Sequence, residues 1–267
     1  MPKGKRKLTL KQRRERARTL IVFGGVFAFA VLIGGGIFGL HRPEVTIASV
    51  EVEGAHYTRE DLVQQFATSM LKGSYFFLIP RSSTFFYPRH AMIRDAQGLF
   101  PAVQSIEIRR DHFTSLHIRI TERETSAWWC TSLSSSTSCY LMDEHGFIFT
   151  KAEESRNDVL VYTGGVTAQP PATTFLNGGY ASLSVFVADT AQATGRTPES
   201  VSVDEHEDVT IFFKEGGELR FSYQSAHDAL LENIASVFAS RRFHSDEILE
   251  YADFRFGNKI YVKFKGE

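Results

Sequence analysis

The sequence predicts an α+β protein with a single N-terminal transmembrane helix, a small β-α-α-β-β domain, and a β-rich domain whose sheet is flanked by helices. Three observations lead to this fold class. Residues 20–40 contain no charged side chain, residues 45–123 alternate between strand and helix patterns, and residues 124–267 show mostly strand patterns. The predicted parts are therefore a basic tail at 1–19, the helix at 20–40, a first domain at 45–123 and a second domain at 124–267.

The apolar segment at residues 20–40 is long enough to cross a membrane. Its 21 residues would form a helix of roughly 31 Å, and the bilayer core is about 30 Å thick. Residues 1–18 carry nine Lys or Arg and one acid, Glu15. Basic residues beside the first span stay in the cytoplasm, so we expect the tail inside and everything after Arg42 outside. A cleaved signal peptide is the alternative, because Ala28-Phe29-Ala30 resembles a cleavage site, but ten apolar or glycine residues follow it.

The charge of the chain is divided unevenly. The formal net charge is −1, of which residues 1–18 carry +8 and the remaining 249 residues carry −9. A mildly acidic outer part is not suited to binding nucleic acid or an anionic membrane face. About 220 residues beyond the span are too many for one small core, which indicates two domains.

Two cysteines, Cys130 and Cys139, lie on the outer side within the sequence WWCTSLSSSTSCYLM. Two apolar strands joined by a Ser/Thr tip would bring them close together, and an oxidising compartment permits a disulfide. Closing so short a loop would contribute about 2–3 kcal/mol. The alternative is two unpaired thiols that flank a loop. The spacing matches no zinc pattern.

In the first domain, alternation of Ile47, Val50 and Val52 predicts a strand that ends at Gly54. Thr58 is the expected N-cap of a helix that continues to about Met70, with Asp61 reaching back to it. Further elements are a helix at 88–97 and strands at 103–110 and 116–122. The predicted order is therefore β-α-α-β-β.

The second domain begins with strands, including a hairpin at 141–150 whose turn holds Asp143 and Gly146. Residues 152–179 are predicted to be irregular. The remaining predicted elements are helices at 181–193 and from Ser225 to about 241, and strands at 201–203, 209–213 and 219–223. Two further strands surround Gly257-Asn258. In the last strand, Ile260, Val262 and Phe264 share one face, and Lys259, Tyr261 and Lys263 share the other.

Six short motifs follow one another behind the basic tail and the apolar span. They are V-E-V-E-G at 50–54, G-S-Y-F-F-L-I at 73–79, P-A-V at 101–103, T-E-R at 121–123, L-M-D-E-H-G-F-I-F at 141–149 and D-F-R-F at 253–256. Together they resemble the FtsQ/DivIB family of bacterial division proteins. Tyr75 stands where the family usually has Asn, Thr125 where it usually has Pro, and the cysteine pair is not expected of it. The resemblance covers 1–150 and 250–264, whereas 151–249 match only in the order of elements.

The resemblance implies a function. The first domain would be a POTRA domain, and the second a β domain whose C-terminal end binds an FtsB-like partner through Phe256, Tyr261, Val262 and Phe264. If the last strand lies at a sheet edge, Lys259, Lys263 and Lys265 would discourage promiscuous pairing and favour an acidic partner. The chain would be a single-pass protein of the cytoplasmic (inner) membrane at the division septum. There it would bind FtsB-like and FtsL-like proteins and help to localise and regulate septal peptidoglycan synthesis.

The sequence contains no G-x-S-x-G and no H-E-x-x-H, two signatures of catalysis. The acidic run at 204–208 is the best metal candidate, but without a glycine-containing calcium loop it indicates a solvated loop between strands. We therefore predict no enzyme activity, cofactor, metal or small-molecule substrate. Two alternatives stay open: a signal-anchored cell-wall enzyme, and a POTRA-type polypeptide-binding chaperone whose client site is the strand at 103–110. A G-x-x-x-G at Gly35 and Gly39 leaves open a helix partner in the membrane.

Overall fold

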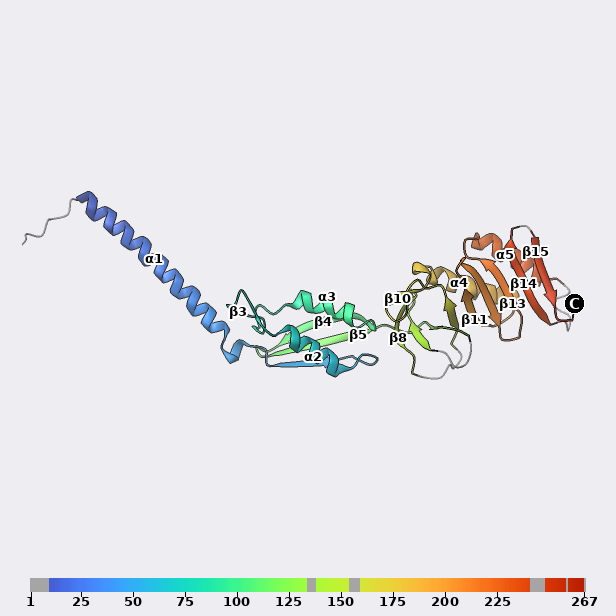
Figure 1. Ribbon diagram of the computed structural model, residues 1–267, viewed down its shortest axis with the longest axis horizontal. Coiled ribbons are helices and arrows are strands. Elements are labelled where there is room, and N and C mark those ends of the chain that lie inside the picture. The colour runs from blue at the N-terminus through green and yellow to red at the C-terminus, as the bar shows by residue number, and fades with distance from the viewer. Residues whose placement is uncertain (1–9, 134–137, 154–158, 241–247, 258, 267) are drawn as a thin grey trace, which may run out of the picture. The chain divides into compact units, whose positions relative to one another are not determined.

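A computed structural model describes residues 10–133, 138–153, 159–240, 248–257 and 259–266 (Figure 1). The predicted α+β fold class is confirmed. The chain divides into two units, one of residues 1–99 with 105–121 and the other of residues 100–104 with 122–267. The second unit thus takes a short segment, residues 100–104, that includes the first two residues of β4 (Val103–Asp111).

The N-terminal helix α1 (Leu10–Leu40) begins ten residues before the predicted span. Lys, Arg, Gln and Glu dominate residues 10–18, and their high helix propensity extends the helix beyond its apolar part. Its segment from Arg18 to Leu40 is long and apolar enough to cross a membrane. Residues 1–9 of the predicted basic tail lie outside the described residues.

Beyond α1, the first unit contains two helices and a three-stranded sheet, with a short 3₁₀ helix η1 (Pro43–Val45) before them. In chain order the elements are β1 (Ser49–Glu53), α2 (Glu60–Met70), β2 (Ser74–Tyr75), β3 (Ile79–Pro80), α3 (Arg89–Leu99), β4 (Val103–Asp111) and β5 (Ser115–Glu122). The sheet order is β1-β5-β4, with β1 parallel to β5, and β2 pairs with β3 in a separate small hairpin. The order β-α-α-β-β therefore contains one additional hairpin between its helices.

Helix α2 begins at Glu60, one residue later than a helix capped by Thr58 would begin. The prediction of Thr58 as N-cap is wrong, because the N-cap residue is Arg59, which makes no side-chain cap hydrogen bond. Asp61 accepts hydrogen bonds from the Arg59 guanidinium at 3.0 and 2.6 Å, so its carboxylate is not directed back to the position of a capping box. Val63 and Ala67 form the buried side of α2, which contacts β1.

The second unit is built on one sheet of ten strands in the order β10-β8-β7-β6-β9-β11-β12-β13-β14-β15. Their bounds are β6 (Ala127–Cys130), β7 (Cys139–Met142), β8 (Phe147–Lys151), β9 (Val161–Gly164), β10 (Thr173–Thr174), β11 (Pro198–Val203), β12 (Asp208–Phe213), β13 (Glu218–Ser222), β14 (Leu249–Phe256) and β15 (Lys259–Phe264). The pairs β6–β9, β9–β11 and β13–β14 are parallel. The sheet is therefore mixed, as an α+β domain allows.

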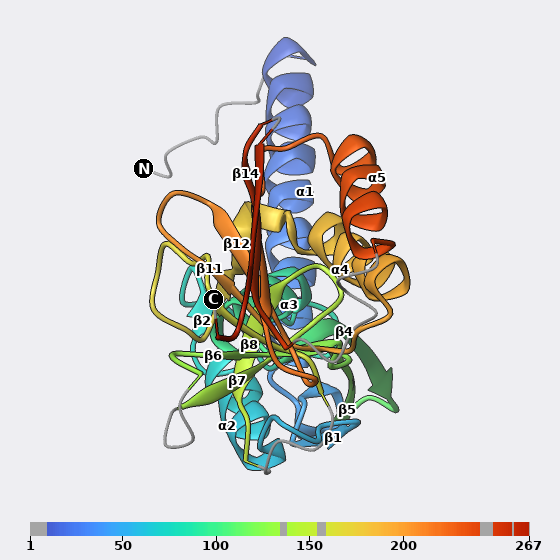
Figure 2. The same ribbon diagram turned by 90° about the vertical axis from the view of Figure 1, so that its right-hand side faces the viewer.

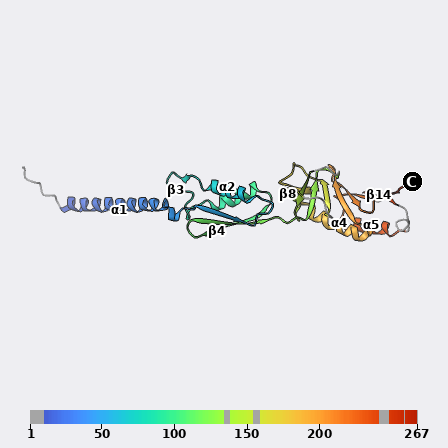
Figure 3. The same cartoon turned by 90° about the horizontal axis from the view of Figure 1, so that it is seen from below.

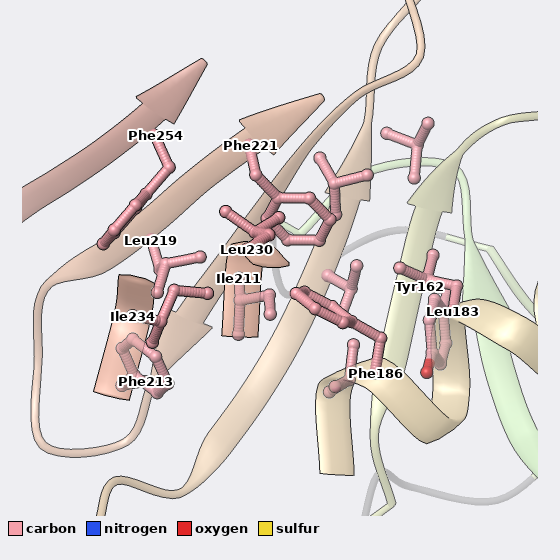
Figure 4. Packing of buried hydrophobic residues seen from close by; sticks show 14 of the residues in the cluster. Tyr162, Leu183, Phe186, Ile211, Phe213, Leu219, Phe221, Leu230, Ile234 and Phe254 are labelled. Carbon is pink, nitrogen blue, oxygen red and sulfur yellow. The ribbon is translucent and has the colours of Figure 1, made fainter. Parts of the chain in front are cut away.

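Two helices, α4 (Tyr180–Thr194) and α5 (His227–Phe238), contact one another and lie on the same side of the sheet (Figures 2 and 3). A 3₁₀ helix, η2 (Phe175–Gly178), precedes α4. Alternate strand residues point toward the helices, as the period of two requires. Phe186 of α4 packs on Phe221 of β13 with ring centroids 4.9 Å apart, and Ile211, Leu219 and Ile234 belong to the same core (Figure 4).

One central strand, β9, is not predicted from the sequence. β9 lies between β6 and β11, within the segment 152–179 that the sequence predicts to be irregular. Three successive residues, Val161, Tyr162 and Thr163, are buried, so the strand shows no alternation of apolar and polar residues. It is also only four residues long and ends at a glycine pair, which is typical of a loop.

Candidate partner-binding edge

Strand β15 ends the ten-stranded sheet, and among the described residues its only neighbouring strand is β14. The opposite end is β10, which is two residues long, whereas β15 has six residues. Short edge strands protect a sheet against pairing with other chains, and long ones present a row of backbone groups for it. The second unit therefore offers one edge suited to accepting a strand.

A hydrogen bond at the end of β15 indicates in which direction each of its backbone N–H and C=O groups points. The N–H of Lys265 donates to the carbonyl of Ile248 at 2.8 Å, so residue 265 directs its backbone groups toward the β14 side. Backbone groups alternate in direction along a strand, and Tyr261 and Val262 stand opposite Asp253 and Ala252 of β14. Tyr261 thus directs its N–H toward β14, and Val262 directs its N–H away from the sheet.

The side chains of β15 divide between two faces. Phe264 is only 2% exposed and belongs to the core under the helices, and the half-buried Ile260 and Val262 pack against that core. Lys259 and Tyr261 are exposed. Of the predicted partner-binding residues, Phe264 can therefore offer a partner only its backbone, because its side chain stabilises the core.

An aromatic pair lies near the turn between β14 and β15. Phe256 and Tyr261 are 54% and 49% exposed, and their rings meet edge to face with centroids 5.2 Å apart. The Arg255 guanidinium carbon lies 5.7 Å from the centre of the Phe256 ring. Exposed aromatic side chains in contact with an Arg side chain are typical anchors of protein interfaces.

Arg255 links strand β14, next to the edge strand β15, to the interior strand β12. Its guanidinium donates to both carboxylate oxygens of Asp253, at 3.0 and 2.7 Å, and to Asp208 at the start of β12, at 2.9 Å. Burial raises the pKa of Asp253, but the hydrogen bonds from Arg255 and the charges of Arg255 and Arg220 outweigh it, and the net pKa is lowered. The pKa of Arg255 is raised by its bonds to Asp253 and Asp208. The hairpin is thereby fixed on its polar face by charged hydrogen bonds.

A second ion pair crosses the last two strands. Lys263 lies 2.9 Å from Glu250, at a position where β14 has an irregularity between Leu249 and Tyr251. Lys263 is thus neutralised within the chain, while Lys259 and Lys265 are exposed. The positive charge available to an acidic partner is smaller than the row of lysines suggests.

The structure brings the predicted residues Phe256 and Tyr261 together and gives Val262 an outward backbone. Sequence reasoning missed the Asp253–Arg255–Asp208 network, as well as Glu250. The alternation in D-F-R-F was a usable signal for the first, because it places Asp253 and Arg255 on the face opposite the buried Phe254. Nothing in the sequence indicates that Asp208, from another strand, joins them.

The two cysteines stand opposite each other on β6 and β7, and a disulfide joins Cys130 to Cys139. In the acidic run at 204–208, the carboxylate of Asp204 accepts the backbone N–H of His206 and of Asp208, at 2.8 and 2.9 Å. The run therefore forms a tight turn between β11 and β12. Within the part of the chain that the structure describes, no group of three or more His, Cys, Asp or Glu is arranged to hold a metal ion.

No model of a known protein family matches the chain, and no curated protein matches it.

Proposed function

We propose that this chain is a membrane-anchored scaffold of the bacterial division machinery that captures an FtsB-like partner by strand addition at β15. The observation that carries the proposal is the edge itself. A six-residue strand ends the sheet, its backbone at Val262 points outward, and an exposed aromatic pair stands beside it. An exposed sheet edge with outward backbone groups and neighbouring side chains is what a peptide needs to add a strand by β-augmentation.

In this mechanism the partner adds a strand next to β15. Main-chain hydrogen bonds supply affinity that does not depend on sequence, and side chains at alternate positions supply selectivity. Tyr261 and Phe256 would anchor the partner on the polar face, while Lys259 would attract acidic side chains. Arg255 would hold the hairpin in place before binding, which lowers the entropy cost of ordering it. No chemical turnover is part of this function.

Helix α1 supports the location. A span with a strongly basic flank is retained with that flank inside, so both units would stand outside the cytoplasmic membrane. There they could bind FtsB-like and FtsL-like proteins at the septum and, as the POTRA-containing family does, help to localise and regulate peptidoglycan synthesis. The resemblance of the six motifs is the ground for naming these partners.

Replacing Val262 with Pro tests the mechanism. The substitution removes an outward N–H and blocks continued pairing on that side, while the hydrogen bonds to β14 are left intact. We expect the full-length protein in nanodiscs to bind the outer segment of its FtsB homologue at least about tenfold more weakly, which corresponds to about 1.4 kcal/mol.

The matched control is Val262→Thr, which keeps the N–H and nearly the same shape and should bind as the wild type does. Circular dichroism and thermal unfolding establish that both variants are folded. A folded Val262→Pro protein that binds with wild-type affinity rules out strand addition at β15 and moves docking elsewhere, for instance to α5.

A polypeptide-binding chaperone is the second candidate, because β4, with nine residues, is also an edge strand in the sheet β1-β5-β4. Its client would pair with β4 and not with β15. Retained client binding in Val262→Pro, together with its loss when proline is placed in β4, would favour this function.

A further inference from the structure

The hairpin β2–β3 carries two phenylalanines at its turn. Phe76 and Phe77 are 90% and 97% exposed, and the N–H of Leu78 closes the turn on the carbonyl of Tyr75 at 3.0 Å. Both phenylalanines have positive φ, 50° and 62°. Turns with two such residues favour Asn-Gly, and bulky side chains are strained there. Two large apolar rings are thus held in solvent where a small polar pair would suit the backbone.

The two rings are part of a set of exposed apolar residues in the first unit, which we call the aromatic tip. It consists of Phe76, Phe77, Leu78, Phe85, Phe86 and Phe113, all about half or more exposed. The rings of Phe85 and Phe113 lie 6.2 Å apart. Exposed apolar residues that gather in one part of a folded domain mark a binding surface for a membrane or a protein.

The aromatic tip is tied to the end of the apolar helix. The N–H of Thr84 donates to the carbonyl of Val45 at 3.0 Å, and the N–H of Ile47 donates to Ser82 at 2.8 Å. Val45 follows Leu40, the last residue of α1, by five residues, which span at most about 18 Å. Strand β3 also contacts α1. Wherever α1 leaves the bilayer, the aromatic tip is therefore close by.

We propose that the aromatic tip inserts into the outer interface of the bilayer that holds α1. The inference rests on the proposed function in one respect, that α1 is the membrane anchor. Phenylalanine carries no polar group, so its ring can enter the acyl region without leaving a hydrogen bond unmade. The six residues of the aromatic tip carry no charge, so attachment is apolar and does not require anionic lipid. Insertion fixes the first unit against the membrane surface.

Depth-dependent fluorescence quenching tests this proposal in the full-length protein. No free cysteine occurs among the described residues, and the sequence contains only the disulfide pair, so an introduced cysteine can be labelled alone with an NBD maleimide. Three variants are compared: Phe77→Cys in the tip, Ala28→Cys in α1, and Leu99→Cys, exposed at the far end of α3 from Phe86. Each is placed in phosphatidylcholine vesicles that contain nitroxide-labelled lipid, at less than one chain per vesicle.

We expect strong quenching at positions 28 and 77 and little at 99. Quenching at 28 but not at 77 overturns the aromatic tip as a membrane contact and leaves the anchor intact. Absence of quenching at 28 instead contradicts the anchor and with it the proposed function. Equal quenching at 77 and 99 overturns selective insertion. Because a second chain is absent from most vesicles, quenching at 77 cannot come from a copy that covers the tip.

A second variant separates insertion from folding. Phe76→Asn combined with Phe77→Gly gives the turn the residues that its backbone favours while removing both rings. A probe at Phe86→Cys should be quenched in the otherwise unchanged protein and at least about threefold less in the Asn-Gly variant, because the anchoring rings are gone. Undiminished quenching in a folded Asn-Gly variant shows that these rings do not hold the tip in the bilayer.

Discussion

Arg255 shows how one residue can stabilise a strand at the edge of a sheet. An edge strand lacks a neighbour on one side, so the hairpin β14–β15 needs other constraints. Arg255 supplies them by bonding Asp253 on its own strand and Asp208 on β12, with β13 between. These bonds lie on the polar face, whereas Phe264 holds the opposite face in the core. Neither contact occupies the outward backbone of Val262.

Replacing Asp253 with Asn should make the protein less stable in a way that depends on pH. Asp253 is buried, and its pKa is lowered in the folded state, so its contribution to stability is present above the unfolded pKa of about 3.9 and disappears as pH falls through the lower, folded value. We expect Asp253→Asn to lower the free energy of unfolding by about 1–3 kcal/mol at pH 7, because charged hydrogen bonds to Arg255 are lost. The difference from the wild type should shrink below about pH 4.

Denaturant unfolding at pH 7 and pH 3 measures this difference. The matched control is Glu250→Gln, which removes the half-exposed ion pair with Lys263 and should cost less than about 1 kcal/mol. A constant difference between Asp253→Asn and wild type at both pH values would mean that the charge of Asp253 is not what stabilises the hairpin.

At the scale of elements, the disulfide joins two strands that the sheet already pairs. Cys130 and Cys139 face each other in the register of β6 and β7, close to the domain core that contains Trp128 and Phe149. Non-reduced peptide mapping of exported protein should give a linked peptide pair. Replacing both cysteines with Ala should lower the free energy of unfolding by about 2–3 kcal/mol, because the unfolded chain regains the freedom of the closed loop.

Reduction of the wild-type protein is the control, and it should lower the midpoint of unfolding to about that of the double variant. Thiols that react with maleimide in the native, unreduced protein would contradict the linkage. A stability unchanged by both treatments would show that closing this loop contributes nothing measurable to the free energy of unfolding.

The elements that the sequence predicts well are those with a clean period. Helices α2 and α3, strands β4 and β5, and the alternation in β15 show apolar residues at the spacing of their final faces. Strand β9 is buried on both faces and has no such period, so it could not be distinguished from a loop. The irregularities of β14, which set the positions of Glu250 and Phe256, depend on the neighbouring strand and have no local signal.

In the candidate site too, only features set by the local sequence could be predicted. Tyr261 and Val262 could be assigned to opposite faces from sequence, because alternation is local. The place of β15 at the end of the sheet follows from the order of all ten strands, including parallel crossovers that no pattern specifies. The aromatic tip was hidden for a related reason: its six residues come from separate segments, and exposed phenylalanines resemble core residues in sequence.

At the scale of the whole molecule, the boundary between the units is not a single point in the chain. Residues 100–104 belong to the second unit, where Arg123 holds them. The Arg123 backbone N–H donates to Ala102 at 2.9 Å, its Nε donates to Pro101 at 3.1 Å, and its guanidinium donates to Asp143 at 2.7 Å. The sequence shows no linker around residue 100, so no local pattern indicates that the chain passes into the second unit there.

If α1 spans the membrane, the orientation of the chain decides on which side of the membrane β15 and the aromatic tip lie. The nine basic residues among the first 18 should keep the N-terminus in the cytoplasm and place everything after Arg42 outside. We expect alkaline phosphatase fused after Glu267 to be active in cells and a fluorescent protein that matures only in the cytoplasm to be dark at the same position. Replacing Arg13, Arg14, Arg16 and Arg18 with Gln should shift part of the population to the opposite signals, because the orienting charge is halved.

A matched variant that changes four exposed basic residues of the second unit should leave both signals unchanged, since long domains cross largely regardless of charge. Cytoplasmic fluorescence of the wild-type fusion, or a mature N-terminus near Val31, would contradict the anchor and remove both outer surfaces from the place where a division partner and the outer face of the bilayer could meet them.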